Sequence, residues 1–228
     1  SKLFDVFVLD KQNKVKNNAQ QFSKDGREVS VHIFNNEKNL LLAFLNYYEE
    51  VNATILTGWN IDFFDIPYLV NRIRRLFGDE KIGKFSPWGK VNSREVEFKN
   101  KKETVYEIMG VAMLDYYEMY RKFSSNPNQE SYKLDYIANV ELGEKKLDYS
   151  QYGNLHQLYK NNYQKFIEYN RQDTLLLDKL DKKLRFLDLA NELAHANTVL
   201  IPTTMGAVAV TEQAIINEAH QLGLIVPN

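Results

Sequence analysis

The segment TGWNIDFFDIPY, residues 57–68, decides the fold. An apolar run at residues 53–57 precedes it and has the composition of a buried strand. Gly58 then allows the backbone to turn, and a helical pattern starts at Ile66-Pro67, where proline is tolerated in the first turn. A strand that leads into a helix through a tight turn is typical of an α/β sheet. Asp65 lies at the start of this helix, where a carboxylate can either cap the helix or bind a ligand.

The rest of the chain extends this alternation of strands and helices. Alternating apolar residues predict strands at Leu3–Leu9 and Glu28–Phe34, and Asn35 or Asn36 can cap the helix that follows. A hairpin is expected at residues 96–109 with its turn at 100–102, and a short strand at 111–114. Helices are expected at residues 66–77, 132–140, 155–162, 164–195 and 205–222. The pattern predicts one α/β unit at residues 1–196, followed by a linker and helix at 197–228.

The overall composition and charge do not indicate a particular function. A total of 29 basic and 30 acidic residues gives a formal net charge of −1. This balance gives no support to nucleic-acid binding, although a local basic patch is enough for a DNA groove. The absence of cysteine excludes disulfides, thiolate metal sites and cysteine nucleophiles. No zinc site is expected, because the four histidines are widely spaced: His32, His156, His195 and His220.

No targeting or membrane segment is visible in the sequence. No apolar run approaches the ~20 residues that a transmembrane helix needs. No signal peptide precedes the first expected strand. We therefore expect an intracellular protein without membrane contact.

A second chemical motif is YNRQD, residues 169–173. Tyr169 and Asp173 are four residues apart, so a helix places both side chains on one face. A carboxylate beside a phenol can hold a cation and orient a water molecule, but such a pair is also routine on a solvated helix surface. Together, Asp65 and Asp173 favour Mg²⁺ or Mn²⁺, because these ions prefer oxygen ligands.

At these residues the sequence resembles the exonuclease region of family B DNA polymerases. Asn60-x-x-x-Phe64-Asp65 resembles the second exonuclease motif, and Tyr169-x-x-x-Asp173 resembles the third motif of the tyrosine-containing DEDD class. The resemblance covers the whole chain and is closest to the replicative polymerases of large tailed phages. It implies a ribonuclease H-like fold with a mixed sheet flanked by helices. It also implies a proofreading 3′→5′ exonuclease, located in the host-cell cytoplasm if the protein is phage-encoded.

The resemblance implies a role for each matching residue. Asp65 and Asp173 would bind the two catalytic Mg²⁺ or Mn²⁺ ions, and Tyr169 would orient the attacking water. Asn60 and Phe64 would contact the 3′ single strand, since a ring can stack on a base without reading it. Lys146 would assist near the scissile phosphate, with Lys145 as the alternative, and the pair can equally be a solvated surface. Lys133 and Leu134 would contact the single strand as well.

Two departures from the family pattern affect these expectations. The first exonuclease motif, Asp-x-Glu on the first strand, does not occur before Asn60, so the chain is expected to lack that strand and to be inactive or weak alone. The family's Ser/Thr-Leu element occurs here as Lys133-Leu134, with Ser131 two residues earlier. No palm motif for synthesis is present. The expected partners are the 3′ end of single-stranded DNA and the remainder of the polymerase, in the same chain or in separate ones.

Several alternatives stay open on sequence alone. The hairpin at residues 96–109 can separate primer from template, or it can simply extend the sheet. Asp115, after an apolar strand, can lie near the metals or act as a buried or capping acid. The whole chain can be an exonuclease, a non-catalytic single-stranded DNA-binding module, or an assembly subunit of a split polymerase that offers an unpaired sheet edge.

Overall fold

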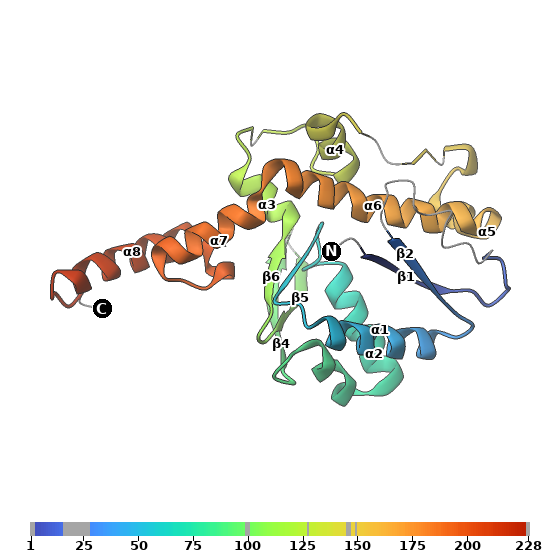
Figure 1. The fold of residues 1–228 in the computed structure, drawn as a ribbon, viewed down its shortest axis with the longest axis horizontal. Coiled ribbons are helices and arrows are strands. Elements are labelled where there is room, and N and C mark those ends of the chain that lie inside the picture. Colours follow the sequence, from blue (N-terminus) through green and yellow to red (C-terminus); the bar gives the residue numbers. More distant parts are fainter. Residues whose placement is uncertain are drawn as a thin grey trace.

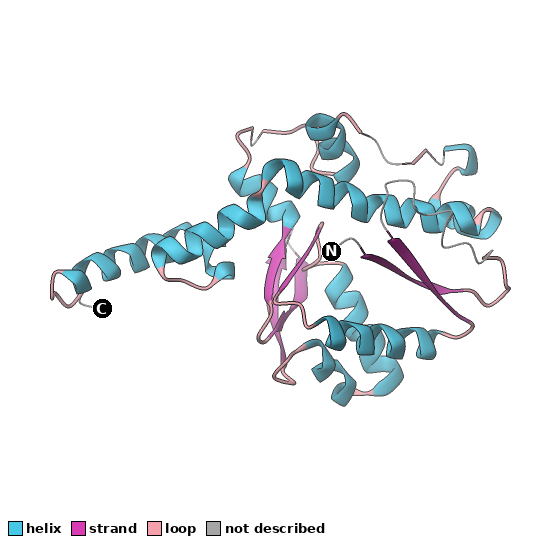
Figure 2. Cartoon of the chain, in the orientation of Figure 1, coloured by secondary structure: helices cyan, strands magenta, loops and turns pink. Residues whose placement is uncertain are grey.

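The structure of the chain is a computed structural model that describes residues 3–15, 28–98, 101–126, 128–144, 147–148 and 150–226. Strands and helices alternate along the first half, and helices dominate the second half (Figure 1). The α/β class predicted from the sequence is therefore confirmed. Figure 2 shows the strands between one group of helices above and another below.

Within the described residues, the strands form three separate two-stranded sheets and not one continuous sheet. Two of the pairs are parallel and the third is an antiparallel hairpin. The predicted mixture of parallel and antiparallel strands is therefore present, but the three pairs are not joined into one sheet in the part of the chain that the structure describes. The pairs are β1 (Leu3–Leu9) with β2 (Glu28–Phe34), β3 (Ile55–Gly58) with β6 (Ala112–Asp115), and β4 (Val91–Phe98) with β5 (Lys101–Ile108).

Helices cover both sides of these strands. Side-chain caps begin several of them; Asn36 Oδ1, for example, accepts a hydrogen bond of 2.8 Å from the backbone N–H of Asn39. The α-helices are α1 (Glu37–Val51), α2 (Asp65–Phe77), α3 (Tyr116–Phe123), α4 (Leu134–Leu142), α5 (Leu155–Asn161), α6 (Tyr163–Leu184), α7 (Phe186–Asn197) and α8 (Ala207–Gln221). Short 3₁₀ helices occur at η2 (Asp79–Phe85), η3 (Ser150–Tyr152) and η4 (Ile201–Met205). No helix in the described part of the chain is both long and apolar enough to cross a bilayer.

Three expectations about element boundaries were wrong. The long helix expected at residues 164–195 is two helices, because Arg185 has a left-handed backbone with φ of 55° that ends α6. The first strand of the hairpin begins at Val91, five residues before the expected start. Asp65 is not the cap of α2: the capping position is Phe64, and Asp65 is the first residue of the helix.

The interior has two large apolar cores. The first lies between α1, α2 and η2 and includes Leu45, Val70 and Phe85. The second lies between α3, α4, α6 and α7 and includes Tyr116 and Leu176. The pair β3–β6 lies between the two cores, because Leu56 and Met113 pack with the first core while Ile55 and Leu114 belong to the second. Residues at the end of β3 can therefore contact both halves of the molecule.

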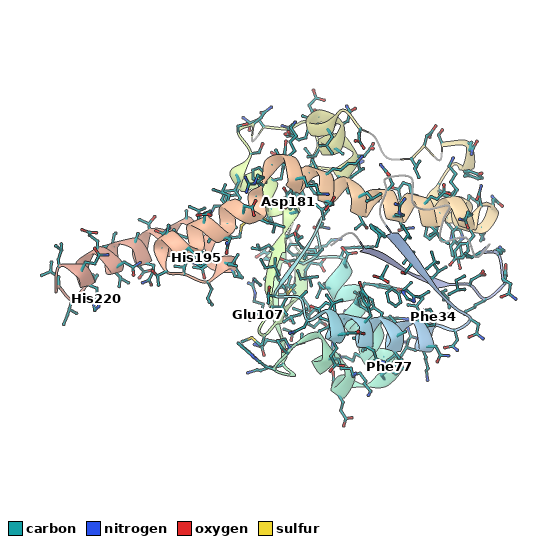
Figure 3. The ribbon with its side chains drawn as sticks, in the orientation of Figure 1. Phe34, Phe77, Glu107, Asp181, His195 and His220 are labelled. Atoms are coloured by element: carbon teal, nitrogen blue, oxygen red, sulfur yellow. The ribbon has the colours of Figure 1, made fainter. Side chains whose placement is uncertain are left out.

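The end of the described chain projects from this body. Figure 1 shows α7 and α8 extending away from the strands. Ile201 and Met205 of η4 pack against the second core, whereas α8 has no buried residue. His195 on α7 and His220 on α8 lie on this arm (Figure 3), far along the chain from His32 and His156.

Candidate active site

The turn after β3 has an unusual backbone that the sequence makes possible. A Cβ atom at Gly58 would lie 2.0 Å from Cγ2 of Ile61, so only glycine fits this close approach. Asn60 follows with a left-handed φ of 67°, a conformation that asparagine tolerates better than most residues. The N–H of Phe64 donates to the carbonyl of Asn60 over 3.1 Å, which closes the turn and leads the chain into α2.

Asp65 lies in the first turn of α2, where the helix dipole favours a negative charge. The N-cap position is Phe64, so the interpretation of Asp65 as the N-cap residue is wrong. Burial of the carboxyl raises its pKa. The residue is nevertheless exposed in the cleft, and a hydrogen bond from its own backbone N–H lowers the pKa, so the carboxylate is accessible to a cation.

Tyr169 and Asp173 lie on α6, one turn apart. Tyr169 is only 7% exposed, and Asp173 is half-buried. The interpretation of this pair as a solvated helix face is therefore wrong. Both side chains face the interior cleft that also contains Asp65.

This cleft has a volume of about 1380 Å³ and lies between the two apolar cores. It contains residues far apart in the sequence: Asp65 from α2, and Tyr169 and Asp173 from α6. The predicted DNA-contacting residues line the same cleft, namely Asn60, Phe64, Lys133 and Leu134. The structure thus brings together every predicted site residue that it describes.

The DNA-contacting candidates differ in exposure. Phe64 is 67% exposed, so its ring is available for stacking. Lys133 precedes α4 and is exposed, while Leu134 is only 8% exposed and belongs to the second core. Leu134 therefore shapes the cleft wall chiefly by packing. Lys146 and its alternative Lys145 lie outside the described residues.

Four further acids near the cleft were not assigned to the site from sequence. Asp135 and Asp148 line the cleft. Asp115, at the end of β6, is only 5% exposed and accepts hydrogen bonds from the turn after β3. Asp62 lies in that turn, and its Oδ1 is buried without a hydrogen bond from any described residue. A signal for Asp115 was present, because parallel strands β3 and β6 end at the same edge of a sheet.

Burial raises the pKa of both Asp115 and Asp62. Burial and, to a lesser extent, the nearby carboxylate of Asp62 raise the pKa of Asp115 to about 6, although hydrogen bonds from backbone N–H groups act in the opposite direction. Asp115 nevertheless accepts three backbone N–H groups, which is the arrangement expected of a structural acid. This confirms the prediction of a buried, capping role for Asp115.

The oxygen donors of the cleft fit Mg²⁺ or Mn²⁺ in kind. Carboxylates of Asp65 and Asp173 line the cleft, and hard divalent cations prefer such ligands. Within the described ranges, however, no group of three or more acidic or histidine side chains is placed to hold a metal ion.

Comparison with known proteins identifies the class to which this fold and cleft belong. Residues 2–137 match the model of the exonuclease domain of DNA polymerase family B. The match covers more than half of the chain, so the chain belongs to this family. The mixed α/β arrangement with small sheets agrees with the ribonuclease H-like type of exonuclease fold.

Individual relatives are full-length polymerases. The chain is 34% identical over 194 residues to the DNA-directed DNA polymerase of Escherichia phage RB69, covering 85% of this chain and 21% of that protein. It is 31% identical to the DNA-directed DNA polymerase of Enterobacteria phage T4, with the same coverage of 85% and 21%. It is 26% identical to the DNA polymerase delta catalytic subunit of Oryza sativa subsp. japonica, covering 88% and 19%. The chain therefore spans about a fifth of the length of these relatives.

Proposed function

We propose that this chain is the 3′→5′ proofreading exonuclease region of a DNA-directed DNA polymerase and removes the terminal nucleotide of single-stranded or frayed DNA. One observation carries the proposal. Asp65, Tyr169 and Asp173 line a single cleft, in a chain of the family B exonuclease class. Surface acids without a common function would have no reason to converge from α2 and α6.

The reaction is hydrolysis of the last phosphodiester bond. The oxygen of a water molecule bonds to phosphorus, the bond from phosphorus to the 3′ oxygen breaks, and a water proton ends on the new 3′ hydroxyl. Tyr169 orients the water through its hydroxyl, and its position beside Asp173 on α6 suits this role. Asp65 and Asp173 hold divalent cations, which when bound activate water and stabilise the leaving oxygen.

The single strand is held by groups on both sides of the cleft. Phe64 stacks on a base without reading its identity, which suits an enzyme that must remove any mismatched nucleotide. Lys133, exposed at the start of α4, contacts phosphate. Asn60 adds a polar contact from the turn after β3. Lys146 assists at the phosphate, with Lys145 as the alternative.

The site is completed by the remainder of the polymerase, in the same chain or in a separate one. Among the described strands, β1 pairs only with β2 and β3 pairs only with β6, so each has an unpaired edge. Apolar side chains of Phe44, Leu56 and Leu69 line the cleft beside its acids. A strand with alternating apolar and acidic residues would cover this apolar wall and add carboxylates to Asp65 and Asp173.

The residue range 197–228 leads toward the rest of the polymerase. The absence of buried residues in α8, together with its exposed Val208 and Ile215, supports this role. As part of a phage-type replicative polymerase, the chain acts inside the host cell.

The test is cleavage of 3′-labelled single-stranded DNA in Mg²⁺ or Mn²⁺, with the chain alone and with an upstream Asp-x-Glu segment restored. We expect cleavage only with that segment, and its loss in Asp173→Asn. The matched control is Asp178→Asn on the same helix, since Asp178 forms an exposed ion pair with Lys182 and does not line the cleft. Equal cleavage by Asp173→Asn and the parent protein would contradict the proposal.

The alternative is a non-catalytic single-stranded DNA-binding or assembly subunit. The incomplete carboxylate set among the described residues favours it. It predicts salt-dependent binding of single-stranded DNA without turnover, even when the upstream segment is restored.

A further inference from the structure

The turn from Gly58 to Phe64 spans the two halves of the molecule. Trp59 packs in the second core, with its ring centroid 6.1 Å from that of Tyr117 and 6.2 Å from that of Tyr120. Its Nε1 donates to the carbonyl of Tyr132 over 3.2 Å. Ile61, two residues later, is buried in the first core. The backbone between Trp59 and Ile61 must therefore reverse direction within a single residue, Asn60.

This reversal requires the left-handed conformation of Asn60, which costs about 1 kcal/mol or more for residues other than glycine. Such a conformation persists only when the surroundings fix it. The turn is also tight at Gly58, where a Cβ would collide with Ile61. A specific set of contacts is therefore needed to hold the turn in this shape.

Asp115 supplies these contacts from the adjacent strand. Gly58 and Asp115 are register partners at the ends of β3 and β6. Oδ1 of Asp115 accepts from the N–H of Asn60 over 2.8 Å, and Oδ2 accepts from the N–H of Asp62 over 3.4 Å. Oδ1 also accepts from the N–H of Tyr117 over 3.0 Å and so caps α3. One buried carboxylate thus joins the turn on each side of Ile61 to the start of α3.

From these contacts we infer that Asp115 is a positioning residue, which locks the turn after β3 so that Asn60 and Phe64 are presented to single-stranded DNA in the cleft. The inference rests on the proposed function for its DNA-binding consequence. A carboxylate is needed because both oxygens accept hydrogen bonds. An amide in the same place has only one oxygen, so its NH₂ group would face one of the two backbone N–H donors.

The positioning role of Asp115 is tested in a Trp88→Phe background. The chain has two tryptophans, so Trp59 is the one that remains. Trp88 is 72% exposed, so its replacement disturbs no core. Acrylamide quenching of Trp59 fluorescence reports on the turn without DNA. Anisotropy of a fluorescein-labelled oligothymidylate, in EDTA to prevent hydrolysis, reports on binding. Both are measured at a pH well above 6, where Asp115 is ionised.

We expect Asp115→Asn to increase quenching of Trp59 several-fold and to weaken oligonucleotide binding by about 10-fold, because it loses one charge-assisted hydrogen bond to the turn. Circular dichroism should show unchanged helix content. Asp115→Ala should show a larger effect; if it does not fold, Asp115→Asn still decides the question.

The matched control is Asn36→Ala, which removes the side-chain cap of α1 but touches no part of the turn. It should lower stability without changing Trp59 quenching. Parent-like quenching in Asp115→Asn, or an equal increase in Asn36→Ala, would overturn the positioning role. A different outcome would overturn the proposed function: neither the parent chain nor the chain with its upstream segment binds the oligonucleotide. The two outcomes can be told apart because Trp59 quenching is measured without DNA.

Discussion

Individual residues of the turn after β3 have separable tasks. Asn60 provides a left-handed backbone, whereas Phe64 provides an exposed ring and Asp65 a carboxylate. Residues 60–65 therefore combine a backbone conformation that the turn requires with side chains that are candidates for binding DNA or a metal ion. Substitutions that keep one property and remove the other can tell them apart.

Substitutions of Asn60 separate its backbone role from a contact of its side chain with DNA. We expect Asn60→Gly to retain the stability of the parent chain within a few tenths of a kcal/mol, because glycine adopts a φ of 67° without strain. Asn60→Ala should lower the free energy of unfolding by ~1 kcal/mol. Urea denaturation measures both. If the Asn60 side chain contacts DNA, both variants should bind a single strand more weakly, while unchanged binding in Asn60→Gly would leave Asn60 with a backbone role only.

A substitution of Phe64 separates the role of its ring in binding DNA from its effect on stability. We expect Phe64→Ala to weaken oligonucleotide binding by roughly 10-fold, since stacking contributes about 1–3 kcal/mol per base, and to leave the thermal unfolding midpoint unchanged because the ring is 67% exposed. The control is Tyr68→Ala, one helical turn later. Tyr68 is 60% exposed but does not line the cleft. Equal weakening by both substitutions would mean that the loss of binding is not specific to Phe64.

At the scale of elements, the contacts of a helix decide whether it belongs to the catalytic unit. The break at Arg185 redirects the chain, so that α6 carries Tyr169 and Asp173 past the cleft while α7 packs on α3 and η4. η4 still belongs to the second core, since Thr204 is 1% exposed and its carbonyl accepts from Lys122 Nζ over 2.9 Å. From these contacts we propose that the boundary between body and arm lies after η4, later than the predicted boundary at residue 196.

Truncation tests this boundary. Ending the chain after Gly206 removes α8, which has no buried residue, so we expect the thermal midpoint of the remainder to stay within 1–2 °C, as for surface changes below about 0.5 kcal/mol. Ending it after residue 196 also removes η4 and should lower the midpoint by several degrees, because the packing of the partly buried Ile201 and Met205 against the second core is lost. Equal midpoints for the two truncations would place the boundary at residue 196.

At the scale of the whole molecule, acids of raised pKa make stability depend on pH. Burial raises the pKa of Asp62 and Asp65, and raises that of Asp115 to about 6. The folded chain therefore binds protons more tightly than the unfolded chain at these sites. Stability from this source is complete below pH 4 and is lost as the pH rises through about 6. Ionisation of these acids therefore lowers stability unless a cation or hydrogen bonds compensate the charge.

The measurement is the free energy of unfolding between pH 4 and pH 7. We expect the parent chain to lose on the order of 3 kcal/mol more over this interval than Asp115→Asn, from the shift of one carboxyl from 3.8 to about 6. Comparison of the two slopes isolates Asp115, because the hydrogen bond from Arg72 lowers the pKa of Glu37 and acts in the opposite direction in both proteins. Parallel curves would show that Asp115 is not protonated in this range.

The sequence by itself determined the class of the fold, most elements and the residues worth testing. Period-two and helical patterns are local, so Leu3–Leu9 and Glu28–Phe34 could be predicted with correct bounds, and Asn36 could be predicted as a cap of the helix that follows. The motifs around Asp65 and Asp173 were visible for the same reason. The break at Arg185 was missed because the residues on both sides keep the helical pattern, and only a left-handed backbone angle separates them.

Only the tertiary structure decided what these residues do together. It showed that Asp65 is not a cap, that Tyr169 is buried, and that both face one cleft with Asp173. It also showed Asp115 joined to the turn that carries Asn60. These facts depend on which strands and helices lie side by side, and contacts between residues more than fifty positions apart leave no periodic trace in a single sequence.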